Sequence, residues 1–334
     1  MPNPKIAKPS VAPRVRLPFL YRERGGRLYC TKCEDFLASK NAERLVGKVN
    51  LIFTSPPFPL NRKKAYGNLD GEAYVEWLSA LAPELAKLLT PAGSIVLEIG
   101  NGWRERSPTM STLAVEALLR FKQRGNLNLI QEFVCHNPAR LPGPAQWVNI
   151  ERIRVTDSFT HVWWMSLNER PFADNRCVLR PYSHSMAKLL ATKKYNSGKR
   201  PSEHHIGKTS FLTNNAGAIP SNVLTFSNTR ATDTYQEYCR LNEIKPHPAR
   251  MQPELPDFFI KFLTSEGHLV FDPFAGSNTT GAIAAMLGRK WISIEAREDY
   301  ALGSRGRFMT ARKAPNDSDR IVPSTSQGGR RVTG

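Results

Sequence analysis

The chain has 334 residues, of which 40% are apolar and 23% are charged. This composition is typical of a globular protein and excludes a wholly disordered or collagen-like chain. No run of about 18 apolar residues occurs, so no segment is predicted to span a membrane. Residues 1–17 lack the apolar core of a secretory signal. Five cysteines, an odd number, argue against a disulfide framework and favour a reducing cytoplasm.

The positive charge is concentrated in three segments. The net charge is +18, and residues 1–27, 180–210 and 305–334 carry almost all of it, so the rest of the chain is nearly neutral. A neutral body with basic segments predicts a polyanionic partner. For the two termini, solvated tails are an equally good interpretation. The internal segment also carries tyrosines and histidines, which can stack or form hydrogen bonds.

Apolar runs and helical spacings alternate along most of the chain. Taken in order, strands are predicted at 27–30, 49–53, 94–99, 130–135, 159–165, 269–271 and 291–294. Helices are predicted between the first two strands up to residue 44, and at 72–89, 110–121, 255–263 and 281–287. Alternating strands and helices predict an α/β fold with a parallel sheet.

Three segments depart from this alternation. Residues 1–24 are rich in proline and arginine and are predicted to form a flexible basic arm, and residues 310–334 a disordered tail. Residues 167–245 are polar and basic, which is typical of an inserted module. The sheet would then be built from residues 25–166 and 246–309.

A loop of small residues follows the predicted strand at 269–271. Residues 272–281 read DPFAGSNTTG and lead into a predicted helix. Small residues let backbone N–H groups approach a ligand, and a helix N-terminus favours negative charge. Glu295 ends the next strand 19 residues after Gly276, where a carboxylate can reach ribose hydroxyls in a Rossmann-like half. The spacing predicts a nucleoside-type cofactor, and NAD remains one of the candidates although the G-x-G-x-x-G pattern is missing.

A second loop, residues 54–58 with the sequence TSPPF, follows the apolar run at 49–53. The two prolines fix the backbone and donate no hydrogen bonds. Neighbouring carbonyls are therefore predicted to be free acceptors at the end of a strand, an arrangement that suits an amino group. The alternative is a rigid loop that merely ends the strand.

Cys30 and Cys33 form a CxxC pair, which is half of a zinc site. No second pair and no HxxxH pattern completes the ligand set, so two buried thiols are the favoured interpretation and no metal is predicted.

Together the two loops resemble those of amino-group DNA methyltransferases. The catalytic loop SPPF precedes the cofactor loop DPFAGSNTT by more than 200 residues, which is the order of the β-group. Ser55 at the head of the loop resembles the cytosine-N4 branch, whereas adenine-N6 enzymes more often carry Asp there. Further family-like stretches are 60–68, 93–103, 200–206, 217–220 and 247–250, and the resemblance covers most of residues 27–304.

The resemblance implies a Rossmann-like class I methyltransferase sheet with a circularly permuted motif order and a target-recognition module at 167–245. It implies S-adenosylmethionine as the methyl donor and double-stranded DNA as the substrate. The implied catalytic residues are Ser55, Pro56, Pro57 and Phe58. The implied cofactor-binding residues are Asp272, Phe274, Ala275, Gly276, Ser277, Thr279, Thr280, Glu295, His247 and Pro248, with Ile294 as a further wall. The DNA-binding candidates are Arg180, Lys193, Lys194, Lys199, Arg200, His204 and Lys208.

The same resemblance assigns roles to the catalytic loop. The target base must leave the duplex stack to be reached, and Phe58 would stack on it. The Ser55 hydroxyl and the carbonyl beside Pro56 would accept the two amine protons, so that the nitrogen lone pair points at the methyl group. Positioning would supply most of the rate acceleration.

One position departs from the family pattern. The family usually has Gly-Asp-Ser after the first strand, where the Asp meets the cofactor adenine, but this chain has Thr31-Lys32-Cys33. A lysine cannot accept a hydrogen bond from the adenine amine. Either the adenine contact is lost or Glu34 or Asp35 replaces it.

The predicted function is therefore site-specific methylation of cytosine N4 in DNA, as the modification enzyme of a prokaryotic or phage restriction–modification system in the cytoplasm. A restriction endonuclease would share the target site without binding the enzyme. Three alternatives remain at this point: adenine-N6 methylation, a DNA-binding protein without activity, and a protein or RNA methyltransferase.

Overall fold

The computed structural model describes residues 15–58, 69, 71–199, 201–203, 205–227 and 233–309. Its strands are β1 (Tyr21–Glu23), β2 (Gly26–Cys30), β3 (Val49–Thr54), β4 (Leu89–Gly100), β5 (Gly102–Trp103), β6 (Met110–Ser111), β7 (Asn128–His136), β8 (Phe159–Ser166), β9 (Gly198–Lys199), β10 (His205–Ile206), β11 (Val223–Thr225), β12 (Leu269–Asp272) and β13 (Lys290–Glu295). Its α-helices are α1 (Cys33–Leu37), α2 (Lys40–Glu43), α3 (Gly71–Leu88), α4 (Leu113–Arg124), α5 (His184–Thr192), α6 (Thr234–Leu241), α7 (Glu254–Leu263), α8 (Thr279–Met286) and α9 (Glu298–Gly303). Shorter turns are η1 (Gln146–Ile150), η2 (Asn175–Val178) and η3 (Ser304–Phe308).

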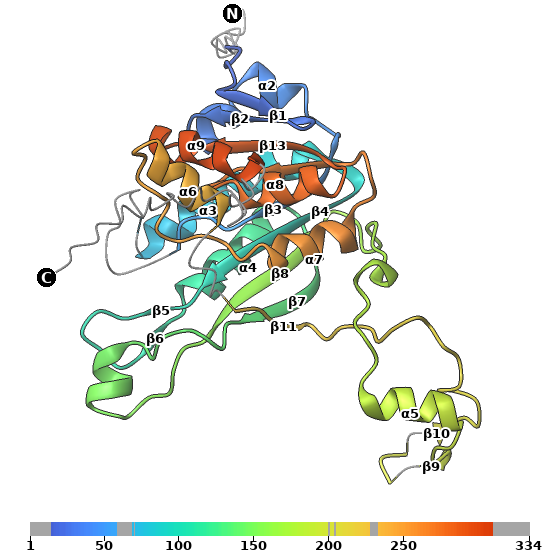
Figure 1. The fold of residues 1–334 in the computed structure, drawn as a ribbon. Coiled ribbons are helices and arrows are strands. Elements are labelled where there is room, and N and C mark those ends of the chain that lie inside the picture. The colour runs from blue at the N-terminus through green and yellow to red at the C-terminus, as the bar shows by residue number, and fades with distance from the viewer. Residues whose placement is uncertain are drawn as a thin grey trace, which may run out of the picture.

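Among the described residues, nine strands form one twisted sheet in the order β1-β2-β13-β12-β3-β4-β8-β7-β11 (Figure 1). Strands β2, β13, β12, β3 and β4 run parallel, which confirms the predicted α/β class. Strand β8 runs antiparallel to both of its neighbours. The chain returns from β7 to β8 through residues 137–158 without a crossover helix along the sheet, and such neighbours pair antiparallel.

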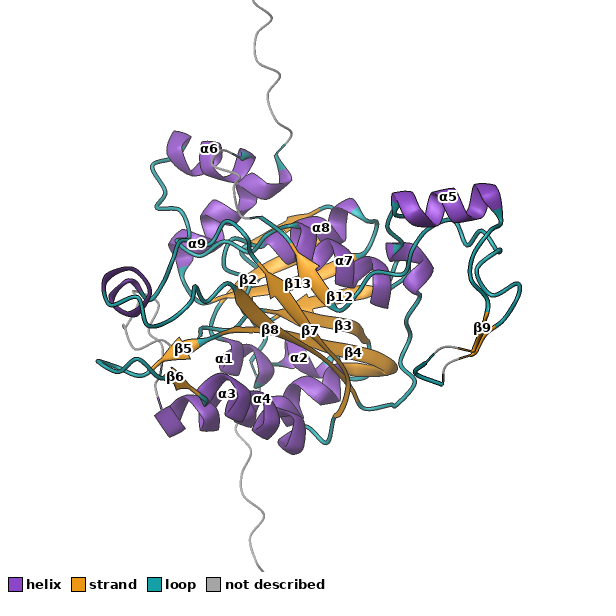
Figure 2. Ribbon diagram, turned by 90° about the horizontal axis from the view of Figure 1, so that it is seen from below, coloured by secondary structure: helices purple, strands orange, loops and turns teal. Residues whose placement is uncertain are grey.

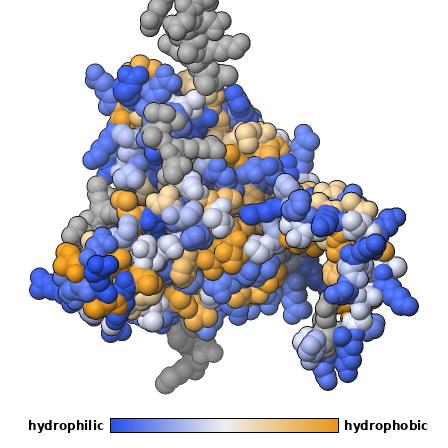
Figure 3. All heavy atoms as spheres, turned by 60° about the horizontal axis from the view of Figure 1, so that its bottom comes forward, coloured by the Kyte–Doolittle hydropathy of each residue, from blue (hydrophilic) through white to orange (hydrophobic). Residues whose placement is uncertain are grey.

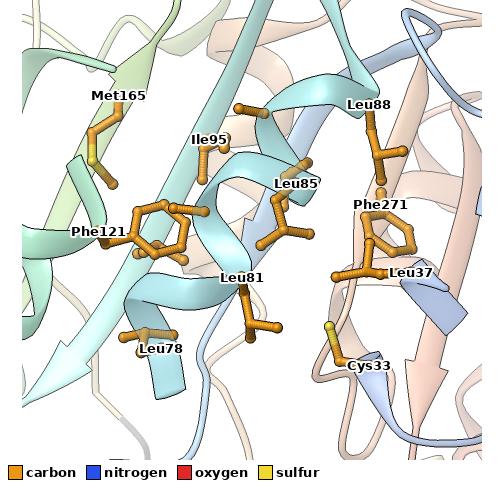
Figure 4. Close-up of a cluster of buried hydrophobic side chains, with 14 of the residues drawn as sticks. Cys33, Leu37, Leu78, Leu81, Leu85, Leu88, Ile95, Phe121, Met165 and Phe271 are labelled. Carbon is orange, nitrogen blue, oxygen red and sulfur yellow. The ribbon is translucent and has the colours of Figure 1, made fainter. Parts of the chain in front are cut away.

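Helices cover both faces of the sheet (Figure 2). One face carries α1 to α4, and the other carries α7, α8 and α9. In α3, leucines at 78, 81, 85 and 88 recur at helical spacing and point at Ile95, Phe121 and Phe271 (Figure 4). Strands such as β3 and β12 are buried on both faces, which is why they appear in the sequence as continuous apolar runs.

The predicted flexible arm over residues 1–24 is wrong for its last part, because Tyr21 is buried. The Tyr21 hydroxyl shares a 2.6 Å hydrogen bond with Ser304 and accepts another, of 3.0 Å, from the Asn278 amide. Burial raises the pKa of Tyr21 to about 12. Residues Tyr21–Glu23 form β1, which is one edge strand of the sheet. Residues 1–14 and the predicted tail at 310–334 lie outside the described residues.

Two other segments differ in detail from the sequence pattern. The helix predicted at 110–121 begins only at Leu113, because residues 110–111 form β6 and pair with β5 in a hairpin. Within residues 167–245, β11 joins the main sheet beside β7, and α6 packs on η3 and α9. The part of this range that stands away from the sheet carries α5, β9 and β10 (Figure 1). No helix in the described part of the chain is long and apolar enough to cross a membrane.

Candidate active site

The catalytic and cofactor loops meet at a switch in chain direction across the sheet. From β12 the chain passes through α8 to β13 on one side, and from β3 through α3 to β4 on the other. The carboxyl ends of these parallel strands share one edge, and the crevice at such a switch point is the usual ligand site of open α/β sheets. Thr54 at the end of β3 donates a 2.6 Å hydrogen bond to Asp272 at the end of β12, which ties the two halves together.

A cavity of about 740 Å³ opens at this edge. This volume falls in the range of about 300–1,000 Å³ that holds cofactors and small ligands. Apart from Ile294, every residue predicted for catalysis or for cofactor binding lines it: Ser55, Pro56, Pro57, Phe58, Asp272, Phe274, Ala275, Gly276, Ser277, Thr279, Thr280, Glu295, His247 and Pro248. Residues more than 200 positions apart in sequence thus face one space.

The cofactor loop is held open by its backbone conformation. Gly276 and Asn278 have φ of +53° and +54°, the left-handed region that glycine and asparagine tolerate best. A Cβ at Gly276 would lie 3.3 Å from the His247 ring, so the glycine also makes room for that ring. Helix α8 starts at Thr279, and its N-terminal turn faces the cavity.

Glu295 braces the same loop. One carboxylate oxygen accepts the Gly276 N–H at 2.8 Å and the other accepts the Arg297 N–H at 2.9 Å. Burial raises the pKa of Glu295. A carboxylate has about four acceptor sites, so two remain for hydroxyl groups of a ligand in the cavity.

A second support comes from Arg307, which in the sequence is only one of several basic residues in the C-terminal segment. Its guanidinium is mostly buried, donates to the Ser277 carbonyl and hydroxyl at 3.3 and 3.1 Å, and pairs with Asp233 at 2.8 Å. No local pattern distinguishes this arginine from the exposed ones around it. It holds the cofactor loop without lining the cavity itself.

Asp272 is buried at the bottom of the site. Besides the Thr54 hydroxyl, it accepts the Phe274 N–H at 3.1 Å and the Thr280 hydroxyl. Burial raises the pKa of Asp272 to about 6, although these hydrogen bonds oppose the shift. Its hydrogen bonds set the path of the chain from β12 into the cofactor loop.

Glu98 on β4 is a site residue that sequence reasoning missed. The Ser55 side chain is hydrogen-bonded to it, and the Thr160 hydroxyl donates to it at 2.9 Å. Burial raises the pKa of Glu98, and the positive charge of Arg140 lowers it to a smaller extent. The available signal was a lone acid in the apolar run at 94–99. Its contact with Ser55 depends on the pairing of β3 with β4.

Phe58 lies over Gly100 at the end of β4. A Cβ built at Gly100 would come within 2.6 Å of the Phe58 ring, so only glycine leaves room for the ring in this position. Phe58 is half-buried and lines the cavity. Its ring therefore presents a flat apolar surface beside Ser55.

On the opposite side, Thr31, Lys32, Cys33 and Glu34 line the cavity, whereas Asp35 does not. The Glu34 carboxylate accepts a 2.5 Å hydrogen bond from the Trp77 indole, and Trp77 packs on Phe274 with 5.6 Å between ring centroids. Of the two acids considered as substitutes for the family's adenine contact, Glu34 alone is in position. Ile294, expected as a wall, is instead fully buried in the core, because its strand is covered on both faces.

The DNA-binding candidates lie away from the cavity. Arg180, Lys193, Lys194, Lys199 and Lys208 are exposed, and most belong to the region of α5, β9 and β10. Arg200 and His204 lie outside the described residues. In the described part of the chain, no group of three or more His, Cys, Asp or Glu side chains could hold a metal ion, and Cys30 and Cys33 are free thiols. The metal-free reaction stays a prediction.

The donor set of the cavity suits a nucleoside with a charged tail. Aromatic rings from Trp77 and Phe274 adjoin the carboxylate of Glu34, while Glu295 keeps free acceptor sites and the first turn of α8 faces the same space. S-adenosylmethionine carries an adenine, a ribose diol and a carboxylate, which correspond to these three features. The residues present therefore fit this cofactor.

Known proteins share both the sequence and the fold. The type II methyltransferase M.PvuII of Proteus hauseri is 41% identical over 291 residues, which cover 86% of this chain and 85% of that protein. The solved structure of the PvuII DNA methyltransferase, described as cytosine-N4-specific, superimposes with a TM-score of 0.70 at 34% identity and covers 90% of this chain and 92% of that one. A complex of M1.HpyAVI with SAM shares the fold, with a TM-score of 0.50, 18% identity and coverage of 84% of this chain and 98% of that one.

A family model described as DNA methylase, for N6 and N4 enzymes, matches residues 49–304. This range contains both loops, Glu98 and Glu295, and it confirms the resemblance drawn from the SPPF and DPFAGSNTT motifs. The chain belongs to the N6/N4 DNA methylase family.

Proposed function

We propose that the enzyme transfers a methyl group from S-adenosylmethionine to the exocyclic N4 of cytosine in double-stranded DNA. The observation that carries the proposal is that Ser55, which is hydrogen-bonded to Glu98, lines the same cavity as Glu295 and the cofactor loop. Similarity to M.PvuII and to the cytosine-N4-specific structure supports the choice of base. When bound, S-adenosylmethionine supplies a methyl group on a positively charged sulfur that leaves as a neutral thioether.

Ser55 orients the amine of the target base. Because the Ser55 hydroxyl can donate its own proton to Glu98, its oxygen lone pairs are free to accept a hydrogen bond from N4. The carbonyl beside Pro56 accepts the second amine proton. These two acceptors draw the nitrogen out of conjugation with the ring and direct its lone pair at the methyl carbon.

Glu98 accepts the proton that the reaction releases. After the N4–carbon bond forms, the methylated amine is positively charged and must lose one proton. Ser55 takes this proton and passes its own to Glu98. A carboxylate whose pKa is raised by burial is a better proton acceptor than one in water.

Phe58 holds the base, and the cofactor residues hold the donor. The Phe58 ring stacks on the cytosine extruded from the duplex. Glu295 accepts the ribose hydroxyls, Glu34 accepts the adenine amine in place of the usual aspartate, and the first turn of α8 binds the carboxylate of the methionine portion.

We propose that residues 167–245 form the target-recognition module, because exposed lysines lie around α5 and β9. Helix α6 and strand β11 of this range anchor it to the rest of the protein. We further propose that the enzyme acts in the cytoplasm of a prokaryote, alongside a restriction endonuclease with the same target site. The type II methyltransferases among its relatives support this setting.

The test is to sequence DNA from methylation-deficient cells that express the chain, with detection of N4-methylcytosine and N6-methyladenine. N4-methylcytosine at one recurring sequence is expected. The Ser55→Ala variant serves as the control that separates this activity from the host background. N6-methyladenine alone would contradict the cytosine assignment, and no modification would contradict the activity itself.

A further inference from the structure

One exposed feature lies outside residues 167–245 and borders the cavity only through the two ends of its longer segment. It consists of the β5–β6 hairpin at 101–112 and the connection between β7 and β8 at 137–158, which we call the arginine lobe. None of the 22 described residues of the connection is buried. Leu141 and Val155 expose 84% and 85% of their surface, and Ile150 exposes 68%. Leu141 and Val155 are the two most exposed large apolar side chains in the described part of the chain.

The arginine lobe is nevertheless held together by specific hydrogen bonds. Its base is closed by a hydrogen bond of 2.8 Å from Asn137 N to Ser158 O. Asp157 accepts from Asn101 at 2.9 Å and from the Trp103 indole at 3.4 Å, which fastens the connection to the hairpin. The Arg154 guanidinium donates to the Pro108 carbonyl in the turn of the hairpin at 2.9 Å. The exposed apolar side chains are thus held in a defined place.

The arginine lobe adjoins the cavity. The two ends of the connection line the cavity through Asn137, Arg140 and Ser158, and Ser55 and Phe58 line the same cavity. The arginine lobe projects on one side of the sheet edge, while the α5–β9–β10 region projects on the other (Figure 1). On the projection at the left of Figure 3, apolar and hydrophilic surfaces lie side by side.

The charge of the arginine lobe matches a polyanion. It holds five arginines (104, 106, 140, 152 and 154) against three acids, and one of the acids, Asp157, is bound to the hairpin. Among the residues that the structure describes, Arg104 and Arg152 have no acidic partner within 4 Å. A surface of exposed arginines and apolar side chains beside the cavity fits a duplex whose backbone and base stack are both contacted.

We propose that the arginine lobe binds the DNA duplex on the side of the extruded base, with Arg104 and Arg152 on phosphates and Leu141 or Val155 in the space that the base leaves. The inference rests on the proposed function, since it requires an extruded base. An apolar side chain in that gap replaces part of the lost stacking and slows the return of the base. A second copy of the chain is the competing occupant, but it would have to approach five arginines with five of its own.

The first experiment replaces both apolar side chains, as Leu141→Ser with Val155→Ser. The substrate is a duplex carrying the target sequence determined for the wild type. The single-turnover rate of methylation is expected to fall about tenfold on the matched duplex, with unchanged affinity for S-adenosylmethionine. A duplex mismatched at the target cytosine, whose base leaves the stack more readily, is expected to restore the rate to within about twofold of the wild type. Val46→Ser, exposed but outside the cavity and the arginine lobe, is the matched control and should leave the rate unchanged.

Three outcomes would overturn the inference: an unchanged rate on the matched duplex, an equal loss on both duplexes, or sedimentation showing that the wild type forms a dimer that the double variant cannot form. If the wild type methylates no duplex at all, that result contradicts the proposed function, which distinguishes it from the three outcomes above.

The second experiment tests the phosphate contacts with Arg104→Gln and Arg152→Gln together. Neither residue lines the cavity. The slope of log affinity for duplex against log salt concentration should become shallower by about two. The rate at saturating DNA should stay within twofold of the wild type. An unchanged slope would exclude the two arginines from the DNA-contacting surface.

Discussion

The cavity at the sheet edge and the α5–β9–β10 region meet opposite requirements. In the cavity, Asp272, Glu295 and Glu98 are held by two or more hydrogen bonds each, and burial raises the pKa of each carboxyl. In the other region, the candidate lysines are exposed: Lys193 and Lys194 directly follow the short helix α5, and Lys199 lies in the two-residue strand β9. Chemistry needs groups fixed to a fraction of an ångström, whereas phosphate binding needs charge that solvent can reach. Variants in the two regions should therefore fail in different ways.

The largest effect is expected at Ser55. Ser55→Ala removes the acceptor of the amine proton and the path to Glu98, so turnover should fall about 100-fold or more. Donor and DNA affinities, measured by calorimetry and by fluorescence anisotropy, should remain within about threefold, because Ser55 binds neither ligand's main portion. A collapse of donor affinity would mean that Ser55 supports the cavity itself.

The burial of Asp272 in the cavity can be tested through the pH dependence of the free energy of unfolding. Its pKa of about 6 lies above the ordinary 3.8, so the folded state binds this proton more tightly than the unfolded state. The stability it contributes is fully present below about pH 4 and is lost as the pH rises to about 6. The loss amounts to at most about 3 kcal/mol. The difference in unfolding free energy between wild type and Asp272→Asn should change by that amount between pH 4 and 7, and a difference independent of pH would refute the shift.

Phe58→Ala should lower turnover about 10- to 100-fold, because stacking on a base contributes about 1–3 kcal/mol. Donor affinity should stay the same, because the ring stacks on the base and not on the donor. Gly100→Ala sharpens this test, since its new Cβ would displace the Phe58 ring without removing it. Single-turnover kinetics should show the same kind of loss for both variants. Full activity of Gly100→Ala would show that the ring need not lie over Gly100.

Glu295→Ala should raise the dissociation constant of S-adenosylmethionine about tenfold, as expected for loss of hydrogen bonds to a charged group. Calorimetry measures this constant without turnover. Because Glu295 also braces Gly276, Glu295→Gln separates the two roles: it keeps one acceptor, so its loss should be smaller. An unchanged constant in Glu295→Ala would remove this residue from the donor site.

The smallest effect on chemistry is expected in the exposed region. Replacing Lys193, Lys194 and Lys199 together by Gln should make the salt dependence of DNA affinity shallower by about 2.7 on a double logarithmic plot. Turnover at saturating DNA should not change. The matched control replaces Lys40, Lys48 and Lys87, which are equally exposed but lie near α2 and the end of α3. If the control variant changes the slope equally, the three lysines act only through the overall charge of the protein.

The local patterns of the sequence determined much of this fold. Apolar runs marked β3, β12 and β13, because parallel strands buried on both faces need apolar residues at almost every position. The loops after β3 and β12 were recognisable, because fixed proline angles and small residues are properties of the residues themselves. Apart from Ile294, the residues assigned to catalysis and to the cofactor on these patterns line one cavity.

The tertiary structure alone decided what neighbours these loops have. Glu98 reaches Ser55 only because β4 pairs beside β3, and Arg307 reaches Ser277 from the last described turn of the chain. The direction of β8, the burial of Tyr21 and the room that Gly100 leaves for Phe58 likewise depend on strands far apart in sequence. A residue pattern reports its own conformation and burial. Contacts across a sheet depend on strand order and register, which no single segment encodes.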